Sequence, residues 1–512
     1  MASLTLYPHQ REAIDWMKRI ETGKLETGTR GGFLLDEMGL GKTITALSLV
    51  KENMPDHYTF IVAPLSVTRQ WLEQIKLFFP EMYPKTQLVP KRATKNTVLF
   101  DFTKRVFILS YSQIQSKYRD LARFLNSNDK ETLVQRFILD EGHMLRNTRT
   151  RRFFKLTLLR EYALRPYTWI LTATPFNNRV SDLQALDKLT AEEYDENYWK
   201  KLRRNPPSMM REMRKWIQKR SMRRKIDILG DKLPQLIVNR YFYTRHNPKY
   251  EELFEKIYQE WIAARPGNEE YVIAQIQLMR KVLADSDGPR TEIAKEKIDA
   301  ILQSQDEYKG DKIIVFSFFK GMIQQLHKEH YKSQSLYIDG EIVSEARFKM
   351  LQTFKTDPTK RILFMTTMTG GIGLNITQAN HILLLEPYYN PFYEKQIFGR
   401  IYRIGQEKRC VVSVLYMKRT LEEWMYLLEY RKRVVGEYIV DLADVSNHGF
   451  VPGEGEQSAL LHFMLNKANQ ANPTRIKEAG SVLRGLGITD THENSSFVLS
   501  ESKNVTSHVW LE

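Results

Sequence analysis

Short runs of aliphatic, β-branched and aromatic residues alternate along the chain with longer stretches in which apolar residues recur at helical spacing. In the first third of the chain, each apolar run stops at a polar turn that leads into a helical pattern. Strands alternating with helices in this way predict a parallel sheet covered on both faces, with ligands bound at the carboxyl ends of the strands. The predicted strands end at Leu35, Ala63, Ser110, Leu139 and Leu171.

A second series of the same kind begins at Lys312 and predicts a second α/β lobe. Its predicted strands are Ile313–Ser317, Ser335–Asp339, Arg361–Thr366, His381–Leu385 and Val411–Tyr416. From Ala191 to Leu302 charged helical patterns replace the alternation, except for a predicted strand at Leu236–Tyr243. We therefore expect an α/β fold with helical insertions. The expected domains are a first lobe over 1–235 with a helical protrusion, a second lobe over 236–445 that begins with a helical protrusion, and a linker with a partly disordered tail over 446–512.

The composition favours a polyanionic partner. Among the 512 residues, 77 are Lys or Arg and 61 are Asp or Glu, which leaves a net charge of +16. Cys410 is the only cysteine, so an internal disulfide and a cysteine-based zinc site are excluded, and a reducing compartment is expected. Met1–Glu21 carries charges throughout, and apolar runs such as Ile313–Phe319 are too short to cross a bilayer. We expect a soluble intracellular protein.

The stretch Gly31–Val50 has the order of a phosphate-binding loop: an apolar strand, a glycine-rich turn and a helix. Gly39 and Gly41 allow backbone N–H groups to face phosphate oxygens, Lys42 can reach the β- and γ-phosphates, and the Thr43 hydroxyl can bind Mg²⁺. The strict pattern GxxxxGK(S/T) has glycine where this chain has Asp36. A chance loop is the alternative, but strand, loop and helix follow in the required order.

Two acidic residues, Asp140 and Glu141, follow directly after an apolar strand. At the carboxyl end of a strand, one carboxylate can hold Mg²⁺ opposite Thr43, and its neighbour can deprotonate the attacking water. We assign Asp140 to the metal and Glu141 to the general base. The alternative is that the two acids only cap the next helix.

Residues near the N-terminus and in the second predicted lobe are further candidates for nucleotide binding. Tyr7 can pack on an adenine base, and Gln10 can pair with its edge through both amide groups. Arg400 and Arg403 are three apart, so on a helix they would project from one face and could stabilise the charge on the γ-phosphoryl group. The alternative for the arginines is an ordinary basic helix.

Together these residues resemble the ATPase core of superfamily 2 helicase-like proteins, and within it the Swi/Snf-like DNA translocases. The resemblance covers about Leu6 to Leu442. Asp36, which departs from the strict phosphate-loop pattern, agrees with this family, because the first motif of the family begins with aspartate. The matching motifs are Asp36–Thr43, Ala63–Ser66 with Trp71, Ile108–Tyr111, Leu171–Asn178, Met222–Lys225 before Leu233 and Pro234, Thr369–Asn375 and Gln396–Gln406.

Three features depart from the family. The acidic motif is DEGH instead of DEAH, and Gly142 is expected to loosen the backbone while leaving Asp140 and Glu141 in place. Glu386–Pro391 stands where the family tends to have Asp-Pro-Trp-Trp-Asn-Pro. The flanking regions are short and contain nothing similar to a histone-tail reader, a layout that resembles members from large DNA viruses or mobile elements.

The resemblance implies two tandem RecA-like lobes that use ATP and Mg²⁺, with Gln396 among the nucleotide-binding residues and Arg400 and Arg403 closing over ATP. It also implies a motor that acts as a monomer, alone or with accessory subunits, on double-stranded DNA, and that shifts nucleosomes or other DNA-bound proteins without separating strands. The site of action would be the nucleus or, for a viral protein, a viral factory or virion, and no membrane is involved. The expected nucleic-acid contacts are Ser66, Thr174, Thr366, Thr369 and Gly370.

Two other functions stay open at this point. The first is a strand-unwinding helicase on DNA or RNA, which the same motifs would serve. The second is a non-catalytic DNA-binding scaffold that keeps the fold without turning over ATP. The presence together of Lys42, Thr43, Asp140, Glu141, Arg400 and Arg403 argues against the scaffold, because a decayed site would lose at least one of them.

Overall fold

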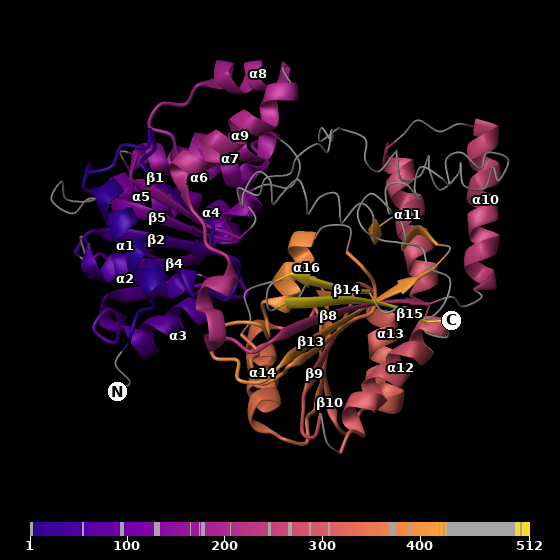
Figure 1. The fold of residues 1–512 in the computed structure, drawn as a ribbon. Coiled ribbons are helices and arrows are strands. Elements are labelled where there is room, and N and C mark those ends of the chain that lie inside the picture. Colours follow the sequence, from indigo (N-terminus) through magenta and orange to yellow (C-terminus); the bar gives the residue numbers. More distant parts are fainter. Residues whose placement is uncertain are drawn as a thin grey trace. The chain divides into compact units, whose positions relative to one another are not determined.

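The computed structural model describes two compact units, one containing the residues up to Lys232 and one beginning at Leu233 (Figure 1). The sequence predicts the division after residue 235. The described residues are 4–53, 56–92, 97–126, 134–163, 165–173, 175, 180–204, 206–243, 247–264, 269–285, 288–305, 308–367, 375–388, 391–418, 420–422, 425–426, 497–501 and 504–511.

The first unit is built on a parallel sheet whose described strands lie in the order β3-β4-β2-β5-β6-β1-β7. Every residue of β1, β2 and β4 is buried, as expected for parallel strands covered on both faces. The strands are β1 (Gly31–Leu34), β2 (Tyr58–Ala63), β3 (Thr86–Leu88), β4 (Val106–Ser110), β5 (Val134–Asp140), β6 (Tyr167–Leu171) and β7 (Ser221–Met222).

Successive residues of these strands pack into different cores, because side chains alternate across a sheet. Phe60 belongs to one core and Ile61 to the other. The core that contains Ile61 is completed by α1 (Pro8–Glu21), α2 (Lys42–Glu52) and α3 (Thr68–Phe78). The core that contains Phe60 is completed by α4 (Tyr111–Ser116), α5 (Tyr118–Asn126), α6 (Arg151–Tyr162), α7 (Val180–Thr190), α8 (Glu196–Arg204) and α9 (Pro206–Arg220). Short 3₁₀ turns are η1 (Tyr83–Lys85), η2 (Gly142–Leu145) and η3 (Ile226–Lys232).

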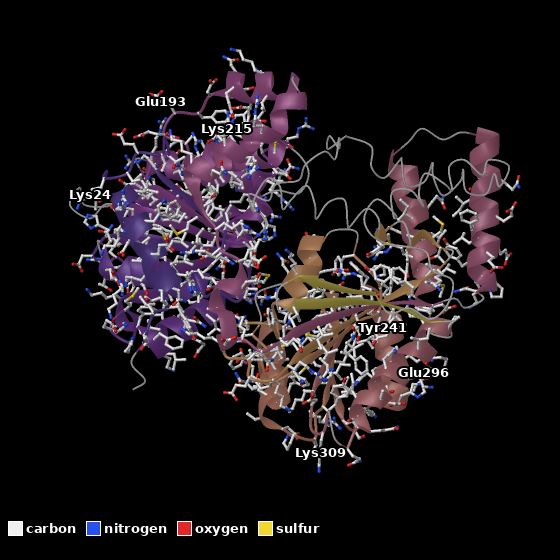
Figure 2. The ribbon with its side chains drawn as sticks, in the orientation of Figure 1. Lys24, Glu193, Lys215, Tyr241, Glu296 and Lys309 are labelled. Carbon is white, nitrogen blue, oxygen red and sulfur yellow. The ribbon has the colours of Figure 1, made fainter. Side chains whose placement is uncertain are left out.

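Helix α9 has one buried face and one basic face. Met213, Trp216 and Ile217 are buried in the core of the first unit. Arg211, Lys215 and Lys219, each four residues from the next, are exposed. Figure 2 labels Lys215 at the surface of this helix. The helix therefore presents a row of cations to solvent.

The second unit contains a sheet with the described order β10-β11-β9-β12-β13-β8-β15-β14, which is parallel except for the β14–β15 pair. Its core residues come from alternate positions of the strands, such as Ile313 and Val315, and from the helices α10 to α13. The strands are β8 (Leu236–Tyr243), β9 (Ile313–Ser317), β10 (Ser335–Ile338), β11 (Ile362–Thr366), β12 (His381–Leu384), β13 (Cys410–Met417), β14 (Phe497–Glu501) and β15 (Asn504–Leu511). The helices are α10 (Pro248–Ala264), α11 (Glu269–Leu283), α12 (Pro289–Leu302), α13 (Lys320–Gln325), α14 (Ser344–Thr356) and α16 (Pro391–Phe398), with a π-helical turn η4 (Leu326–His330).

The structure confirms the expected fold class, two α/β lobes with parallel sheets and helices between the two series of strands. Residues 497–501 and 504–511 form the hairpin β14–β15, within the stretch for which the sequence predicts a linker and a partly disordered tail. Phe497–Leu499 and Val505–Thr506 are aromatic, aliphatic and β-branched residues, which favour strands once a sheet edge offers partners. That edge is β8, with which β15 pairs in parallel. None of the helices within the described residues is long and apolar enough to cross a membrane.

Candidate functional site

The turn between β1 and α2 has the backbone geometry that the glycine pattern predicts. Gly39 and Gly41 adopt φ angles of 89° and 82°, in the left-handed region that favours glycine. A Cβ atom on Gly41 would lie 2.3 Å from Gln10 Nε2, so any other side chain would displace that amide. Gly41 directly precedes α2, whose first N–H groups have no partners within the helix. The turn therefore leads into a helix N-terminus suited to an anion.

Lys42 points back into this turn. Its Nζ atom donates to the carbonyl oxygens of Asp36 at 2.6 Å and Glu37 at 3.2 Å. Burial lowers the pKa of Lys42, while the nearby carboxylates, Glu141 first among them, raise it. The ammonium group thus sits in a desolvated position, where a polyphosphate would supply the negative charge that stabilises it.

The start of α1 contacts the same turn. Gln10 is 3% exposed, its Oε1 accepts from the Tyr7 backbone N at 3.0 Å, and its Nε2 donates to the Leu40 carbonyl at 3.3 Å. The His9 Nε2 atom lies 3.0 Å from the same carbonyl. Both polar ends of the Gln10 amide are therefore used within the chain, so pairing with adenine would require this side chain to exchange partners. The adenine contact of Tyr7 and Gln10 stays a prediction.

The acidic pair lies at the carboxyl end of β5, where Asp140 is the last strand residue. Asp140 Oδ2 accepts a 2.8 Å hydrogen bond from the Trp71 indole, and the Asp140 carbonyl accepts a 2.7 Å bond from the Tyr111 hydroxyl. Burial, together with the charge of Glu141, raises the pKa of Asp140 to about 7. The sequence indicates Trp71 only as a motif residue. That its indole reaches Asp140 is decided by the packing of α3.

Glu141 has a left-handed backbone, with φ 51° and ψ 45°, which is uncommon outside glycine and costs energy. This conformation turns the chain sharply after β5. His143 Nδ1 then lies 3.1 Å from Glu141 Oε2 and 3.1 Å from Thr172 Oγ1. The histidine therefore links the predicted general base to the end of β6.

The residues present fit ATP and Mg²⁺. Gly39 and Gly41 hold the turn in a left-handed backbone, and the half-buried Lys42 lies close enough to Glu141 and Asp140 for their charges to act on it. Asp140 and Glu141 are adjacent, partly buried carboxyl groups, and a divalent cation would neutralise their negative charge. Within the described residues no cluster of three or more His, Cys, Asp or Glu could hold a metal ion. One or two protein ligands plus phosphate oxygens is the usual arrangement for Mg²⁺, and Thr43 and Asp140 would supply them.

Gly142 has a tight environment. A Cβ atom on this residue would lie 2.6 Å from Ile170 Cγ2, and Ile170 is fully buried in β6. The isoleucine methyl group therefore fills the space that the alanine of a DEAH motif would need. Glycine at this position is matched to Ile170.

Replacing Gly142 by alanine is expected to destabilise the protein, although it restores the usual motif. The added methyl group must push Ile170 out of its packing position, and overpacking of this kind costs about 1–3 kcal/mol. The melting temperature checks this. Ile170→Leu moves the branch away from Cβ, so Gly142→Ala should lower the melting temperature less when it is combined with Ile170→Leu. An unchanged melting temperature in Gly142→Ala alone would show that the backbone relaxes at no cost.

In the second unit the structure corrects the placement of the two arginines. Helix α16 ends at Phe398, and Arg400 and Arg403 lie in the turns that follow, instead of on one helix face. Gly405 has φ 93°, in the left-handed region, so the backbone departs from helical geometry just after Arg403. Arg400 is 1% exposed, and burial lowers the pKa of Arg403 to about 10. Gln396, by contrast, is on α16 as expected and is buried.

Gln406 holds this turn in place, a role that its position at the end of the motif did not indicate. Its Nε2 atom donates to the carbonyls of Ala379 at 2.9 Å, Thr377 at 3.1 Å and Ile401 at 3.1 Å. The Arg400 carbonyl in turn accepts from Ile376 N at 3.1 Å. The segment with the arginines is therefore tied to the residues that precede β12.

The predicted nucleic-acid contacts are described only in part. Ser66 lies just beyond the carboxyl end of β2, and its Oγ atom has no hydrogen-bond partner within the described residues. Thr366 is the last residue of β11 and is 9% exposed. Thr174, Thr369 and Gly370 lie outside the described residues.

Family models match most of the chain. Residues 9–325 match the SNF2-related domain, and residues 295–405 match the helicase conserved C-terminal domain. The chain belongs to the SNF2-related family. The resemblance recognised from the motifs is thereby confirmed.

Relatives of this SNF2-related chain come from a virus, bacteria and eukaryotes. It is 26% identical over 468 residues to a probable global transactivator of Orgyia pseudotsugata multicapsid polyhedrosis virus, covering 83% of this chain and 90% of the relative. It is 23% identical to an uncharacterized ATP-dependent helicase of Mycoplasma pneumoniae, covering 84% of this chain and 42% of the relative. It is 24% identical to the CHD3-type chromatin-remodeling factor CHR7 of Arabidopsis thaliana, and the match covers 85% of this chain and 37% of the relative. The chain thus spans less than half of the last two relatives.

Among solved structures, the Sulfolobus solfataricus SWI2/SNF2 ATPase core in complex with dsDNA is similar at 20% sequence identity. The match covers 86% of this chain and 94% of that chain, with a TM-score of 0.39.

Proposed function

We propose that this chain hydrolyses ATP and uses the energy to move along double-stranded DNA, displacing or remodelling proteins bound to it. One observation carries the proposal: Lys42 lies in a glycine-rich turn within electrostatic reach of Asp140 and Glu141, and all three stand at the carboxyl edge of one parallel sheet. Membership of the SNF2-related family supports the same activity.

The roles of the residues follow from their positions. Lys42 and the N–H groups at the start of α2 bind the phosphates, and Thr43 and Asp140 are the protein ligands to Mg²⁺. When bound, Mg²⁺ supplies positive charge to the β- and γ-phosphate oxygens. Glu141 takes the proton of the attacking water, and His143 keeps the carboxylate oriented through its 3.1 Å contact.

DNA is the proposed nucleic acid. The net charge of +16 and the exposed cations Arg211, Lys215 and Lys219 on α9 favour binding to a phosphate backbone. Contacts of this kind bind any sequence with similar affinity, as a motor that moves along DNA requires. For a protein of this activity we propose the nucleus or a site of viral DNA replication as the place of action.

A translocation assay tests the proposal. The full chain would be given ATP and duplex DNA that carries either a triplex-forming strand or a positioned nucleosome. Displacement of the triplex strand without separation of the duplex is the expected result, and nucleosome sliding would extend the activity to chromatin. Strand displacement on a forked duplex, or hydrolysis stimulated more by RNA than by duplex DNA, would favour the helicase instead. No stimulation of hydrolysis by any nucleic acid would overturn the proposal.

Replacing Arg403 by alanine is expected to reduce turnover by roughly 10³-fold or more while leaving nucleotide affinity nearly unchanged, because such arginines act on charge that develops in the transition state. Steady-state phosphate release and titration with a fluorescent ATP analogue would separate the two effects. Arg409→Ala, at an exposed arginine further along the same segment, is the matched control. Equal losses of binding and turnover in Arg403→Ala would indicate a structural role.

A further inference from the structure

Asp36, the residue that breaks the strict phosphate-loop pattern, is fully buried and paired with an arginine from far along the chain. Arg224 contacts both of its carboxylate oxygens, with Nε 2.8 Å from Asp36 Oδ1 and an Nη atom 2.5 Å from Oδ2. The backbone N of Arg224 also donates to Oδ1 at 3.0 Å. Bidentate, charge-assisted pairs of this kind are among the strongest hydrogen-bonded contacts in proteins.

The same arginine reaches the start of α1. Its other Nη atom donates to the His9 carbonyl and lies 3.2 Å from Glu12 Oε2. The His9 ring in turn contacts the Leu40 carbonyl, in the glycine-rich turn. Arg224 therefore joins the first residue of the turn to the helix that packs over the rest of it.

Neighbouring residues repeat this connection along the backbone. β7 pairs with β1, and Leu35 N donates to the Met222 carbonyl at 2.8 Å. Glu37 N donates to the Arg224 carbonyl at 3.0 Å, and Glu37 Oε2 accepts from Ile226 N at 2.9 Å. The segment Met222–Ile226 thus runs beside the start of the phosphate loop and fixes it by main-chain and side-chain bonds.

The Asp36–Arg224 pair is also connected to Lys42, the proposed phosphate-binding lysine. Lys42 Nζ donates to the carbonyl oxygen of Asp36, the residue whose carboxylate Arg224 holds. A shift of Asp36 would move both the loop backbone and the position of the ammonium group. Glycine at this position, as in the strict pattern, has no side chain through which the rest of the domain could hold it.

We infer that Asp36 and Arg224 form a positioning pair that sets the conformation of the phosphate loop, and with it the affinity for nucleotide. The inference rests on the proposed ATP site, which it deepens. Arg224 touches no reacting group; it acts through Asp36 and His9. Because the segment that carries Arg224 follows α9 directly, the pair also connects the basic helix of this unit to the nucleotide site.

The test compares nucleotide binding by full-length variants, measured by titration with a fluorescent ATP analogue. Asp36→Gly, which creates the strict loop pattern, and Arg224→Met should each raise Kd between roughly 10- and 100-fold, since small misplacements of binding groups have effects of this size. The double variant should bind nucleotide no more weakly than the single variant with the higher Kd, because both substitutions remove the same contact between Asp36 and Arg224. Arg224→Lys, which keeps the charge without the bidentate geometry, should lie between wild type and Arg224→Met.

Arg30→Met is the matched control. Arg30 directly precedes β1, at the end of the strand opposite the phosphate loop, and its Nε atom donates to the Arg165 carbonyl at 2.7 Å. Kd should therefore stay within about 2-fold of wild type. Melting temperatures identify variants that fail to fold. If Asp36→Gly fails to fold, Asp36→Asn replaces it, because asparagine is nearly equal in size to aspartate.

Two outcomes separate this inference from the proposed function. If Lys42→Ala abolishes binding while Asp36→Asn, Arg224→Lys and Arg224→Met bind like wild type, the positioning pair is refuted and the ATP site stands. If Lys42→Ala binds nucleotide like wild type, the ATP site itself is refuted. If the losses of nucleotide-binding free energy in Asp36→Gly and Arg224→Met were additive in the double variant, the two residues would act independently. That result would also refute the positioning pair.

Discussion

Glu141→Gln is expected to reduce DNA-stimulated ATP hydrolysis by roughly 10²- to 10⁴-fold, the usual contribution of a positioned general base. The amide keeps the size of the carboxylate and its contact with His143 but cannot take a proton from water. Nucleotide binding should persist, because the phosphate-binding groups at Gly41, Lys42 and the start of α2 are unchanged. Phosphate release at saturating duplex DNA measures the first effect, and titration with a fluorescent ATP analogue measures the second.

Lys42→Ala should behave differently, because it removes the proposed phosphate ligand, which would act in the ground state as well as in the transition state. Both binding and turnover should fall. Glu196→Gln is the control for the chemical change, since Glu196 is an exposed residue of the same unit that forms a surface ion pair with Lys200. If Glu141→Gln kept more than about a tenth of the turnover, Glu141 would not be the general base.

Arg136→Met is expected to lower the stability of the first unit by about 3–5 kcal/mol, because it leaves the carboxylate of Glu21 buried without its counter-charge. Both side chains are fully buried, and Arg136 Nη2 lies 2.6 Å from Glu21 Oε2. Glu21 is the last residue of α1, and it also accepts from the Trp169 indole at 2.8 Å. Arg136 donates to the Asn53 carbonyl at 2.9 Å, just past the end of α2.

The double variant Glu21→Gln with Arg136→Met tests the physical reason. A neutral amide can keep hydrogen bonds to its neighbours without an uncompensated charge, so the double variant should melt at a higher temperature than Arg136→Met alone. Glu196→Gln, which breaks an exposed pair, should change stability by less than about 1 kcal/mol. A double variant less stable than Arg136→Met would mean that the charge of Glu21 is stabilised by other groups.

Much of the fold could be predicted from the chain alone. Ile313–Ser317 is an almost continuous apolar run, and the structure contains β9 with the same bounds. Such a run predicts a parallel strand covered on both faces, because apolar side chains then meet apolar neighbours on either side of the sheet. Leu236–Tyr243 is interrupted by Asn239 and Arg240, but its aliphatic and aromatic residues still predict a strand, and β8 has the same bounds. The hairpin β14–β15 could not be predicted in this way, because its place in the sheet depends on pairing with β8 more than on its own composition.

The candidate site was predictable wherever one short segment carries the chemistry. The turn depends on the local backbone of Gly39 and Gly41, so the spacing of these glycines and Lys42 indicated it. Spacing of three predicts one helix face for the two arginines, whereas α16 ends at Phe398 and the left-handed Gly405 turns the chain after Arg403. Local spacing could not show where the helical pattern that precedes the arginines would stop.

The sequence by itself determined the class of sheet, the glycine-rich turn after β1, the acidic pair at the end of β5 and the family, because each is recorded in motifs of a few neighbouring residues. Tertiary structure alone decided that the Trp71 indole donates to Asp140 and that Ile170 requires glycine at position 142. It also decided that Arg224 pairs with Asp36, 188 positions away in the chain. Parallel strands bring such residues together only after the crossover helices have packed, and no local pattern records which side chains will then meet.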